Sequence, residues 1–150
     1  MSVGRICSRD VHLADSNESV ALAAMRMRNH QVGTLVVLDE QKRPIGIVTD
    51  RDLAVRVMAA GKDPHSCNVA EIMTRSPKTV REDAPIEEAL NQMSQLGVRR
   101  MIVVDEEHRL AGIVSLDDVL SLLGEEISRI GRLLDHQGAA AGPEPQAAKA

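Results

Sequence analysis

The chain has 150 residues, the size of one ordinary domain, and its hydrophobic fraction of 43% is enough for a packed core. It carries a formal net charge of −4 without a basic stripe and contains no Phe, Tyr or Trp, so neither charge nor base stacking on aromatic rings supports a nucleic-acid partner. Its apolar stretches end well before the ~18 residues of a membrane span, and residues 1–9 lack the apolar core of a signal peptide, so we expect a cytosolic protein that binds neither nucleic acid nor anionic membranes.

An amphipathic helix is the first element that the pattern predicts. Apolar residues recur three, four and seven positions after Val20, ending at Met27, and this is the spacing of one helix face. Asn17 is a suitable N-cap. Gly33 lies near the expected end of the helix, where a left-handed residue is tolerated.

Two short β-rich runs follow at residues 35–38 and 45–49, separated by an Asp-Glu-x-x-Arg turn. A second helix is expected over residues 51–60, with Gly61 as its stop signal. The unit therefore has the order helix, strand, strand, helix. A polar linker over residues 61–68 separates this unit from the rest of the chain.

The same unit then occurs a second time. A shift of 66 residues, from Val32 to Val98, places the first half on the second without a gap over a run that ends at Leu53 and Val119. Because a repeat of about 60 residues is marginal alone, we expect the two to bury their apolar faces against each other in one pseudo-symmetric α/β globule. The matching elements are a helix capped by Asp83 and ending near Gly97, strands at residues 101–104 and 111–115, and a helix over residues 117–123.

The C-terminal segment departs from the repeat. Ile127, Ile130, Leu133 and Leu134 mark one more amphipathic helix over residues 125–135, which would pack on the globule or on a partner. From His136 onward Ala, Gly, Pro and Gln dominate, and we expect disorder over residues 136–150. The expected organisation is therefore a first repeat with its linker at 1–66, a second repeat at 67–124, this helix and a disordered tail.

The residues with chemical potential lie where a strand meets a helix in each repeat. Both corners have the form Gly, two apolar residues, Thr or Ser, two further residues and Asp, which pairs Thr49 with Asp52 and Ser115 with Asp118 on one face of a helical turn. The carboxylate can accept hydrogen bonds from both hydroxyls of a ribose, and the hydroxyl can donate to a phosphate oxygen. The same spacing is also a capping box that needs no ligand, although its occurrence at two equivalent corners favours a ligand site.

Catalytic and metal-binding groupings are weak in this sequence. No Ser-His-Asp or Cys-His arrangement is suggested, and Cys7 is the one candidate nucleophile or redox sensor, with a buried structural thiol as the alternative. His65 and Cys67 lie close together, but a metal site needs three or four ligands and the remaining histidines are scattered. We therefore predict neither an enzyme nor a metal-binding protein.

The corners and the segments around them resemble the CBS domain family, and the span from Val3 to Leu123 is similar to a tandem CBS pair, the Bateman module. Residues 69–74 look like the family's opening strand, and residues 97–105 look like its central strand. The resemblance implies two repeats, each with a short opening strand before its helix, strand, strand and helix. It also implies that the repeats pack sheet to sheet around a pseudo-twofold axis and form two clefts for adenosine-containing ligands.

By this resemblance each cleft takes its carboxylate and hydroxyl from one repeat and its adenine-side wall from the other. The first cleft gathers several cations near the expected phosphates, whereas the second, weaker cleft has Asp117 where the first has Arg51, which disfavours polyphosphate. The alternatives are solvated or inter-repeat surface charges for Arg99 and Arg100 and a turn cap for Thr74. The first cleft comprises Thr49, Arg51, Asp52, Thr74, Lys78, Val98, Arg99 and Arg100, and the second comprises Ser115, Asp118, Ser8, Val11, Val32 and Thr34.

The resulting prediction is a stand-alone, non-catalytic CBS pair that senses cellular energy by binding AMP, ADP or ATP, with S-adenosylmethionine and NAD(H) ranked behind them. We expect a homodimer that passes ligand occupancy to an unidentified effector protein through small shifts between the repeats. The alternative is a ligand-independent scaffold, in which the exposed helices and residues 124–134 dimerise or dock on another protein.

Overall fold

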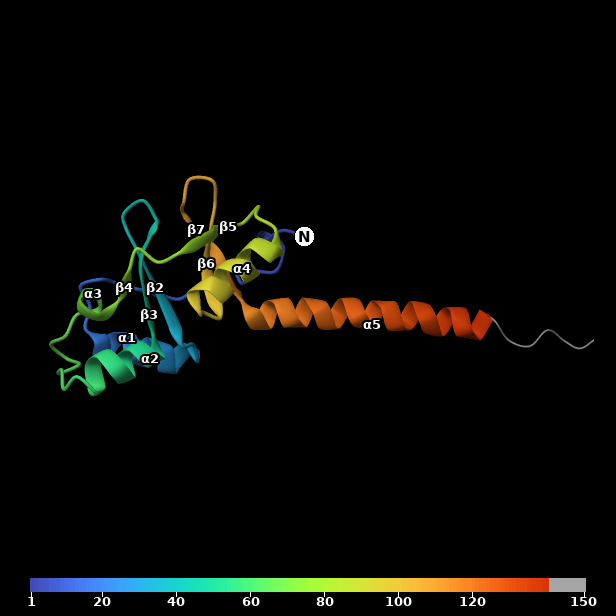
Figure 1. Ribbon diagram of the computed structural model, residues 1–150. Coiled ribbons are helices and arrows are strands. Elements are labelled where there is room, and N and C mark those ends of the chain that lie inside the picture. The colour runs from blue at the N-terminus through green and yellow to red at the C-terminus, as the bar shows by residue number, and fades with distance from the viewer. Residues whose placement is uncertain (141–150) are drawn as a thin grey trace, which may run out of the picture. The chain divides into compact units, whose positions relative to one another are not determined.

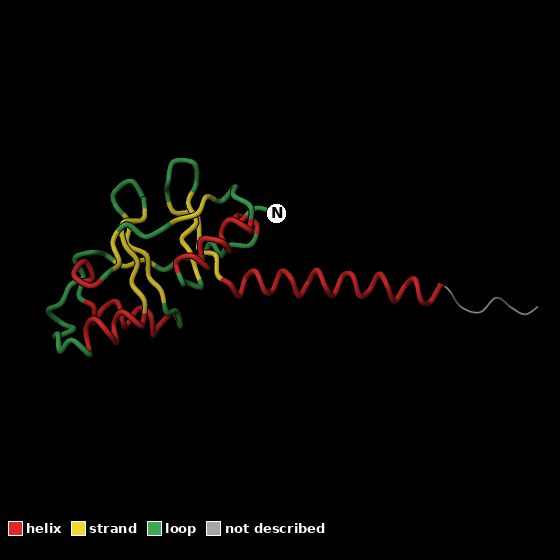
Figure 2. Tube along the Cα trace, in the orientation of Figure 1, coloured by secondary structure: helices red, strands yellow, loops and turns green. Residues whose placement is uncertain are grey.

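The structure is a computed structural model that describes residues 1–140, and these residues form two units (Figure 1). The first unit spans Met1–Leu116 and contains a four-stranded and a three-stranded sheet (Figure 2). The second unit begins at Asp117. Within the described residues, no helix combines the length and the apolar character needed to cross a membrane.

Both repeats have the predicted order of helix, strand, strand and helix. The second helix of the first repeat differs in detail, because three α-helical residues continue as six residues of π-helix. The first repeat comprises α1 (Val20–His30), β2 (Thr34–Leu38), β3 (Pro44–Thr49), α2 (Asp50–Asp52) and the π-helical η2 (Leu53–Met58). The second comprises α4 (Ile86–Leu96), β6 (Arg100–Val104), β7 (Leu110–Ser115) and the start of α5 (Leu116–Ala140).

The first helix of each repeat begins later than the sequence predicts. Ser19, not Asn17, caps α1, and its hydroxyl accepts a hydrogen bond from the Leu22 amide at 3.3 Å. α4 begins after Pro85 rather than after Asp83, because the Asp83 carboxylate instead pairs with Arg81 at 2.7 Å.

The helix ends are partly as predicted. Gly97 ends α4 in the left-handed conformation, with φ of 65°. In the first repeat Gln31 takes this position with φ of 54°, two residues before Gly33. A left-handed Gln is costlier than a left-handed Gly, and its amide is held by the Arg28 and Met27 carbonyls.

Each repeat carries an antiparallel pair of strands with a parallel strand at its edge. β1 (Leu13–Ala14) lies beside β2, and β5 (Thr79–Arg81) lies beside β6. The Asp39 and Asp105 carboxylates hold the two hairpin turns. Each accepts hydrogen bonds from two backbone N–H groups, with N···O distances of 2.8 to 3.0 Å. These turns correspond to the predicted Asp-Glu-x-x-Arg segments.

The opening segments of the two repeats are exchanged. β4 (Thr74–Arg75), which opens the second repeat, pairs with β3 of the first repeat and places Thr74 opposite Ile47. The equivalent residue of the first repeat, Ser8, pairs with Ile113 in β7 of the second. Each repeat therefore supplies an edge to the other's sheet.

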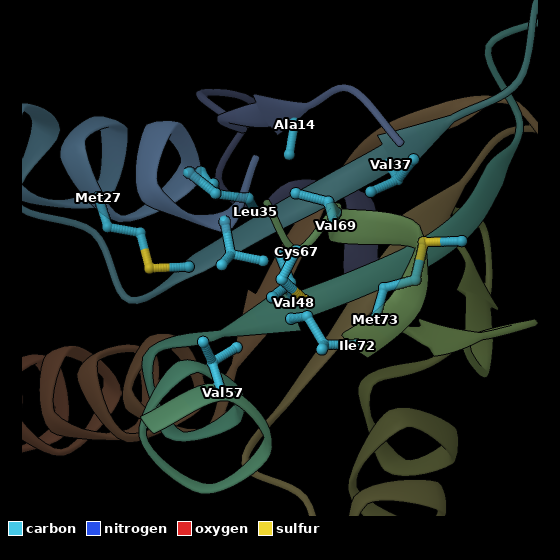
Figure 3. Packing of buried hydrophobic residues seen from close by; sticks show 12 residues of the cluster. Ala14, Met27, Leu35, Val37, Val48, Val57, Cys67, Val69, Ile72 and Met73 are labelled. Carbon is cyan, nitrogen blue, oxygen red and sulfur yellow. The ribbon is translucent and has the colours of Figure 1, made fainter. Parts of the chain in front are cut away.

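The hydrophobic cores follow the same exchange. α3 (Val69–Ile72) inserts Val69 and Ile72 among core residues of the first repeat such as Leu35 and Val48 (Figure 3). η1 (Val3–Arg5), a turn of 3₁₀-helix, places Val3 in the core of the second repeat. A third cluster, formed by Val36, Ile102 and Val104, joins the two repeats and supports their sheet-to-sheet packing.

The predicted opening strand over residues 69–74 is wrong for most of its length. Val69–Ile72 is helical, and strand geometry begins only at Thr74. The physical reason is that Val69 and Ile72, three residues apart, both face one core, which a helical turn allows and a strand does not. The Asn68 and Glu71 side chains close a capping box on this turn.

The C-terminal prediction also needs correction. α5 is one helix of 25 residues, so the helices predicted at 117–123 and 125–135 are joined. Gly124 between them lowers helix propensity but does not force a stop. Residues 136–140 of the predicted disordered tail belong to α5, and residues 141–150 lie outside the described residues.

The glycine that opens each corner motif lies where the exchanged segment crosses the sheet. A Cβ atom on Gly112 would lie 2.6 Å from the Ser8 backbone oxygen and 2.9 Å from the Cys7 sulfur. A Cβ atom on Gly46 would instead meet the flexible Met73 side chain, whose sulfur is its nearest neighbour. Both positions therefore need glycine for space, and Gly112 has less room to adjust because its neighbour is backbone.

We expect Gly112→Ala to lower the free energy of unfolding by about 2 kcal/mol, because the new methyl group overpacks against backbone. Gly46→Ala, the matched control, is expected to cost less than about 1 kcal/mol because Met73 can change rotamer. Urea denaturation followed by circular dichroism measures both. A loss for Gly46→Ala equal to or above that for Gly112→Ala would contradict this account of the exchange.

Candidate functional site

A cavity of about 520 Å³ in the first unit is lined by both repeats. It lies at the corner where β3 meets α2, opposite the start of β6. The structure brings together at this cavity all of the residues predicted for the first cleft: Thr49, Arg51, Asp52, Thr74, Lys78, Val98, Arg99 and Arg100.

The corner itself is a complete capping box. The Thr49 hydroxyl accepts a hydrogen bond from the Asp52 amide at 3.3 Å, and the Asp52 carboxylate accepts one from the Thr49 amide at 2.8 Å. The other Asp52 oxygen lies 3.6 Å from the Arg56 guanidinium. The capping box, which was the alternative to a ligand site, is therefore present in the structure. It leaves the Thr49 hydroxyl proton and further carboxylate lone pairs available to a ligand.

Positive charge dominates the polar part of the cavity. Four cationic side chains line it against two carboxylates, those of Asp50 and Asp52. Arg100 points across the repeats, where its guanidinium donates to the Thr34 hydroxyl at 2.8 Å. Since Thr34 and Arg100 occupy equivalent positions of the two repeats, this hydrogen bond crosses the pseudo-twofold axis. The excess of cations suits an anionic ligand.

An apolar wall completes the cavity, and the sequence prediction missed most of it. The two-residue period of a strand could have indicated part of this wall. Ile47 lies two residues before Thr49 and Ile102 two residues after Arg100, on the same strand faces. Asp50 was also missed. It lies against Gly33, where a Cβ atom would come within 2.8 Å of its carboxylate, so this glycine leaves room for Asp50. The lining residues not predicted are Ile47, Asp50, Pro77, Leu96, Met101 and Ile102.

The second predicted set is only partly brought together. Ser8 pairs with β7, two residues before its last residue, Ser115, while Thr34 begins β2. Val11 packs against the cluster that joins the repeats, and Val32 packs against the core of the first repeat. Asp118 lies in the first turn of α5, within the second unit. Its grouping with the other residues stays a prediction.

The cysteines belong to different cores. Cys67 is buried in the first core, and burial raises the pKa of its thiol, with a hydrogen bond to Glu71 acting in the same direction. Cys7 packs against the second core. A raised pKa lowers the thiolate fraction and hence the nucleophilicity of Cys67. In the part of the chain that the structure describes, no group of three or more His, Cys, Asp or Glu residues could hold a metal ion.

Comparison with known proteins points to one family. A model of the CBS domain matches residues 3–59 and 69–125. Hypoxic response protein 1 of Mycobacterium tuberculosis is 37% identical over 120 residues, which are 80% of this chain and 83% of that protein. An uncharacterized protein of Methanopyrus kandleri is 38% identical over 122 residues, which are 81% of this chain, and the match spans 62% of that protein's length.

A solved structure extends the comparison to three dimensions. The CBS domain pair of protein MJ0100, in complex with 5′-methylthioadenosine and S-adenosyl-L-methionine, matches with a TM-score of 0.74 and 32% sequence identity. The match covers 84% of this chain and 98% of that one. Because one repeat with its linker is fewer than half of the residues, a match of this extent spans parts of both repeats.

The capping box makes a prediction that needs no ligand. Thr49→Ala removes the hydroxyl that accepts from the Asp52 amide, so the free energy of unfolding should fall by about 1 kcal/mol. Thr49→Ser keeps an acceptor at the same place and should retain most of that stability. Thermal unfolding by circular dichroism checks both variants. An unchanged melting temperature for Thr49→Ala would show that the cap contributes nothing.

Proposed function

The chain belongs to the CBS domain family as two CBS domains in tandem, and from this we propose that it is a non-catalytic regulatory module that binds an adenine nucleotide. The binding site in this proposal is the cavity around Thr49 and Asp52. The observation that carries the proposal is the make-up of its lining, which joins an apolar wall, a hydroxyl with a carboxylate, and four cations.

Each part of a nucleotide has a matching group in the cavity. The apolar wall, with Val98 and Ile102, suits the faces of an adenine ring. The Asp52 carboxylate can accept from ribose hydroxyls, and this carboxylate is already held in place by the Thr49 amide. The cations Arg51 and Lys78 lie on the same lining and can neutralise phosphate oxygens.

The charge of the lining ranks the ligands. The MJ0100 domain pair supports an adenosyl ligand for this family, since that structure holds 5′-methylthioadenosine and S-adenosyl-L-methionine. Both of those ligands lack phosphate, whereas four cations against two carboxylates favour an anion in this cavity. We therefore rank AMP, ADP and ATP ahead of S-adenosylmethionine. NAD(H) also carries phosphate, so the charge of the lining does not separate it from the mononucleotides, and NAD(H) keeps the lower rank predicted from the sequence.

Occupancy would be read by another protein. A ligand that contacts both repeats can bias their relative placement, because it binds one arrangement more tightly than another. In this proposal the chain acts in the cytoplasm as an energy sensor, forms a homodimer and passes its state to an unidentified effector protein. No catalytic step is assigned to it.

A second candidate function is supported by the helices of the first repeat. Four large apolar side chains on α1 and η2 are exposed, and such a patch is typical of a protein contact. A scaffold that dimerises or docks through this patch would need no ligand. The patch comprises Leu22, Met25, Val55 and Met58.

A panel of thermal unfolding measurements separates the two candidates. AMP, ADP, ATP, NAD, NADH and S-adenosylmethionine are each added to the wild-type chain, and unfolding is followed by calorimetry or circular dichroism because the chain has no Tyr or Trp. A bound ligand at a hundred times its dissociation constant should add about 2.7 kcal/mol of stability. No shift with any ligand would contradict the proposal and favour the scaffold.

Two variants locate the site in the same panel. Asp52→Ala should lower the ligand-induced gain from about 2.7 to about 1.4 kcal/mol or less, the value for tenfold weaker binding at the same ligand concentration. Because the change also breaks the capping box, the gain is measured from the variant's own ligand-free baseline. Lys78→Ala leaves the capping box intact and should reduce the shift with AMP and ATP more than the shift with S-adenosylmethionine. A full shift in Asp52→Ala would place the ligand elsewhere.

The two corners should differ in affinity for a charged nucleotide. Asp52→Ala is expected to weaken binding of AMP or ATP by about tenfold or more, because it removes a charged hydrogen-bond acceptor. Asp118→Ala, the equivalent change in the second repeat, is expected to weaken it by less than about threefold. Isothermal titration calorimetry measures both. A larger loss for Asp118→Ala would reverse the ranking of the two clefts.

A further inference from the structure

α5 carries an exposed apolar seam along its length. Five large apolar residues follow one another at alternating intervals of three and four, and each leaves between 51% and 69% of its surface exposed. This is the a and d spacing of a coiled coil, in which such a seam faces another helix. The seam comprises Leu120, Leu123, Ile127, Ile130 and Leu134.

Part of the seam lies outside the residues matched by the CBS domain. The family match ends at residue 125, whereas α5 continues to Ala140. Ile127, Ile130 and Leu134 therefore lie beyond the matched domain. A contact through the whole seam is an addition to the family's architecture in this chain.

Glycines repeat beside the seam with a period of seven. Gly124 and Gly131 each follow a seam residue directly, and Gly138 continues the series. Glycine inside a helix is less favourable than alanine. A Cβ atom added at any of the three would meet no atom within 4 Å, so packing among the described residues of the second unit does not require these glycines. Their position instead leaves room for a second helix to approach closely.

The distribution of charge along α5 indicates which helix would pair with it and in which orientation. Four carboxylates lie in residues 117–126, whereas the following turns carry Arg129 and Arg132 with one carboxylate, Asp135. Arg129 pairs with Glu126 at 2.9 Å, but both side chains stay about half exposed and can also meet a partner's charges. Two parallel copies of α5 would place carboxylates beside carboxylates. Two antiparallel copies place the arginines of one beside the carboxylates of the other.

We propose that α5 pairs with α5 of a second copy of this chain as an antiparallel coiled coil, with the seams facing each other and the glycines at the closest approach. This gives the homodimer of the proposed function a specific interface, and it can be tested apart from ligand binding, because the pairing needs no nucleotide and uses residues outside the CBS match. The seam is self-complementary, as an interface between identical copies requires.

Association of the full 150-residue chain tests the pairing. Sedimentation equilibrium should show a dimer, and Ile127→Asp with Ile130→Asp should weaken dimerisation at least about a hundredfold, since each buries an unpaired carboxylate in the seam. The matched control, Ser121→Asp with Ser128→Asp, adds the same charge away from the seam. It should change the dissociation constant of the dimer by less than about threefold. A monomeric wild type, or a double seam variant that dimerises as the wild type does, overturns the proposal.

A glycine variant separates lost association from lost folding. Gly131→Leu raises the helix propensity of α5, so the helical signal in circular dichroism should not fall. If Gly131 faces the partner, the new side chain should weaken dimerisation about tenfold or more by overpacking. If Gly131→Leu dimerises as tightly as the wild type, the proposed close contact at Gly131 is wrong.

A cysteine variant tests the orientation. In a Cys7→Ala, Cys67→Ala background, Leu134→Cys places one thiol near the end of each seam. An antiparallel pair keeps the two thiols more than two helical turns apart, so no disulfide should form between copies under oxidising conditions. A parallel pair in register brings them into contact. Rapid formation of a covalent dimer therefore overturns the antiparallel arrangement.

Discussion

The exchange of opening segments is the constraint on which the rest of the first unit depends. Thr74 pairs with β3 of the first repeat and Ser8 with β7 of the second, so neither sheet is complete within its own half of the sequence. The cores obey the same rule, since Val69 and Val3 are each buried in the other repeat. Two segments that would each be marginal alone therefore fold as one cooperative unit, and the boundary between the halves in sequence is not a boundary in space.

The candidate site follows directly from this exchange. Because the second repeat's opening segment crosses β3, Thr74 and Lys78 reach the corner that holds Thr49 and Asp52. The start of β6 supplies the opposite side, where Arg100 donates to Thr34 of the other repeat. A ligand in this cavity would therefore contact parts of both repeats. That position is the physical basis for the proposed regulatory role, since a ligand shifts an equilibrium only through groups whose arrangement differs between states.

The internal repeat made much of the fold predictable. The strands at β2, β3, β6 and β7 begin one residue before their predicted starts, because buried β-branched runs between turns leave few alternatives. The sequence also placed the eight residues of the first cleft, which line one cavity. Local patterns failed where tertiary context decides, as with the helical turn at Val69–Ile72, whose apolar residues enter the core of the other repeat. They also misplaced the cap at Ser19 and divided α5 at Gly124, where helix propensity alone does not force a stop. Pro77 and Leu96 were missed because they reach the cavity from segments outside the strands at the corner, whereas the alternation of β3 and β6 could have indicated Ile47 and Ile102.

The capping box has a consequence for how a ligand would be recognised. The Thr49 and Asp52 side chains are already fixed by hydrogen bonds to backbone amides, so these groups are preorganised before any ligand arrives. Little rotamer freedom remains to be lost on binding at this corner. Discrimination among adenosyl compounds would then depend on the long side chains of the lining such as Arg51 and Lys78, which have more rotamer freedom to lose when they order around the phosphates. A rigid ribose grip beside an adaptable phosphate grip is an arrangement that can distinguish ligands by the number of their phosphates.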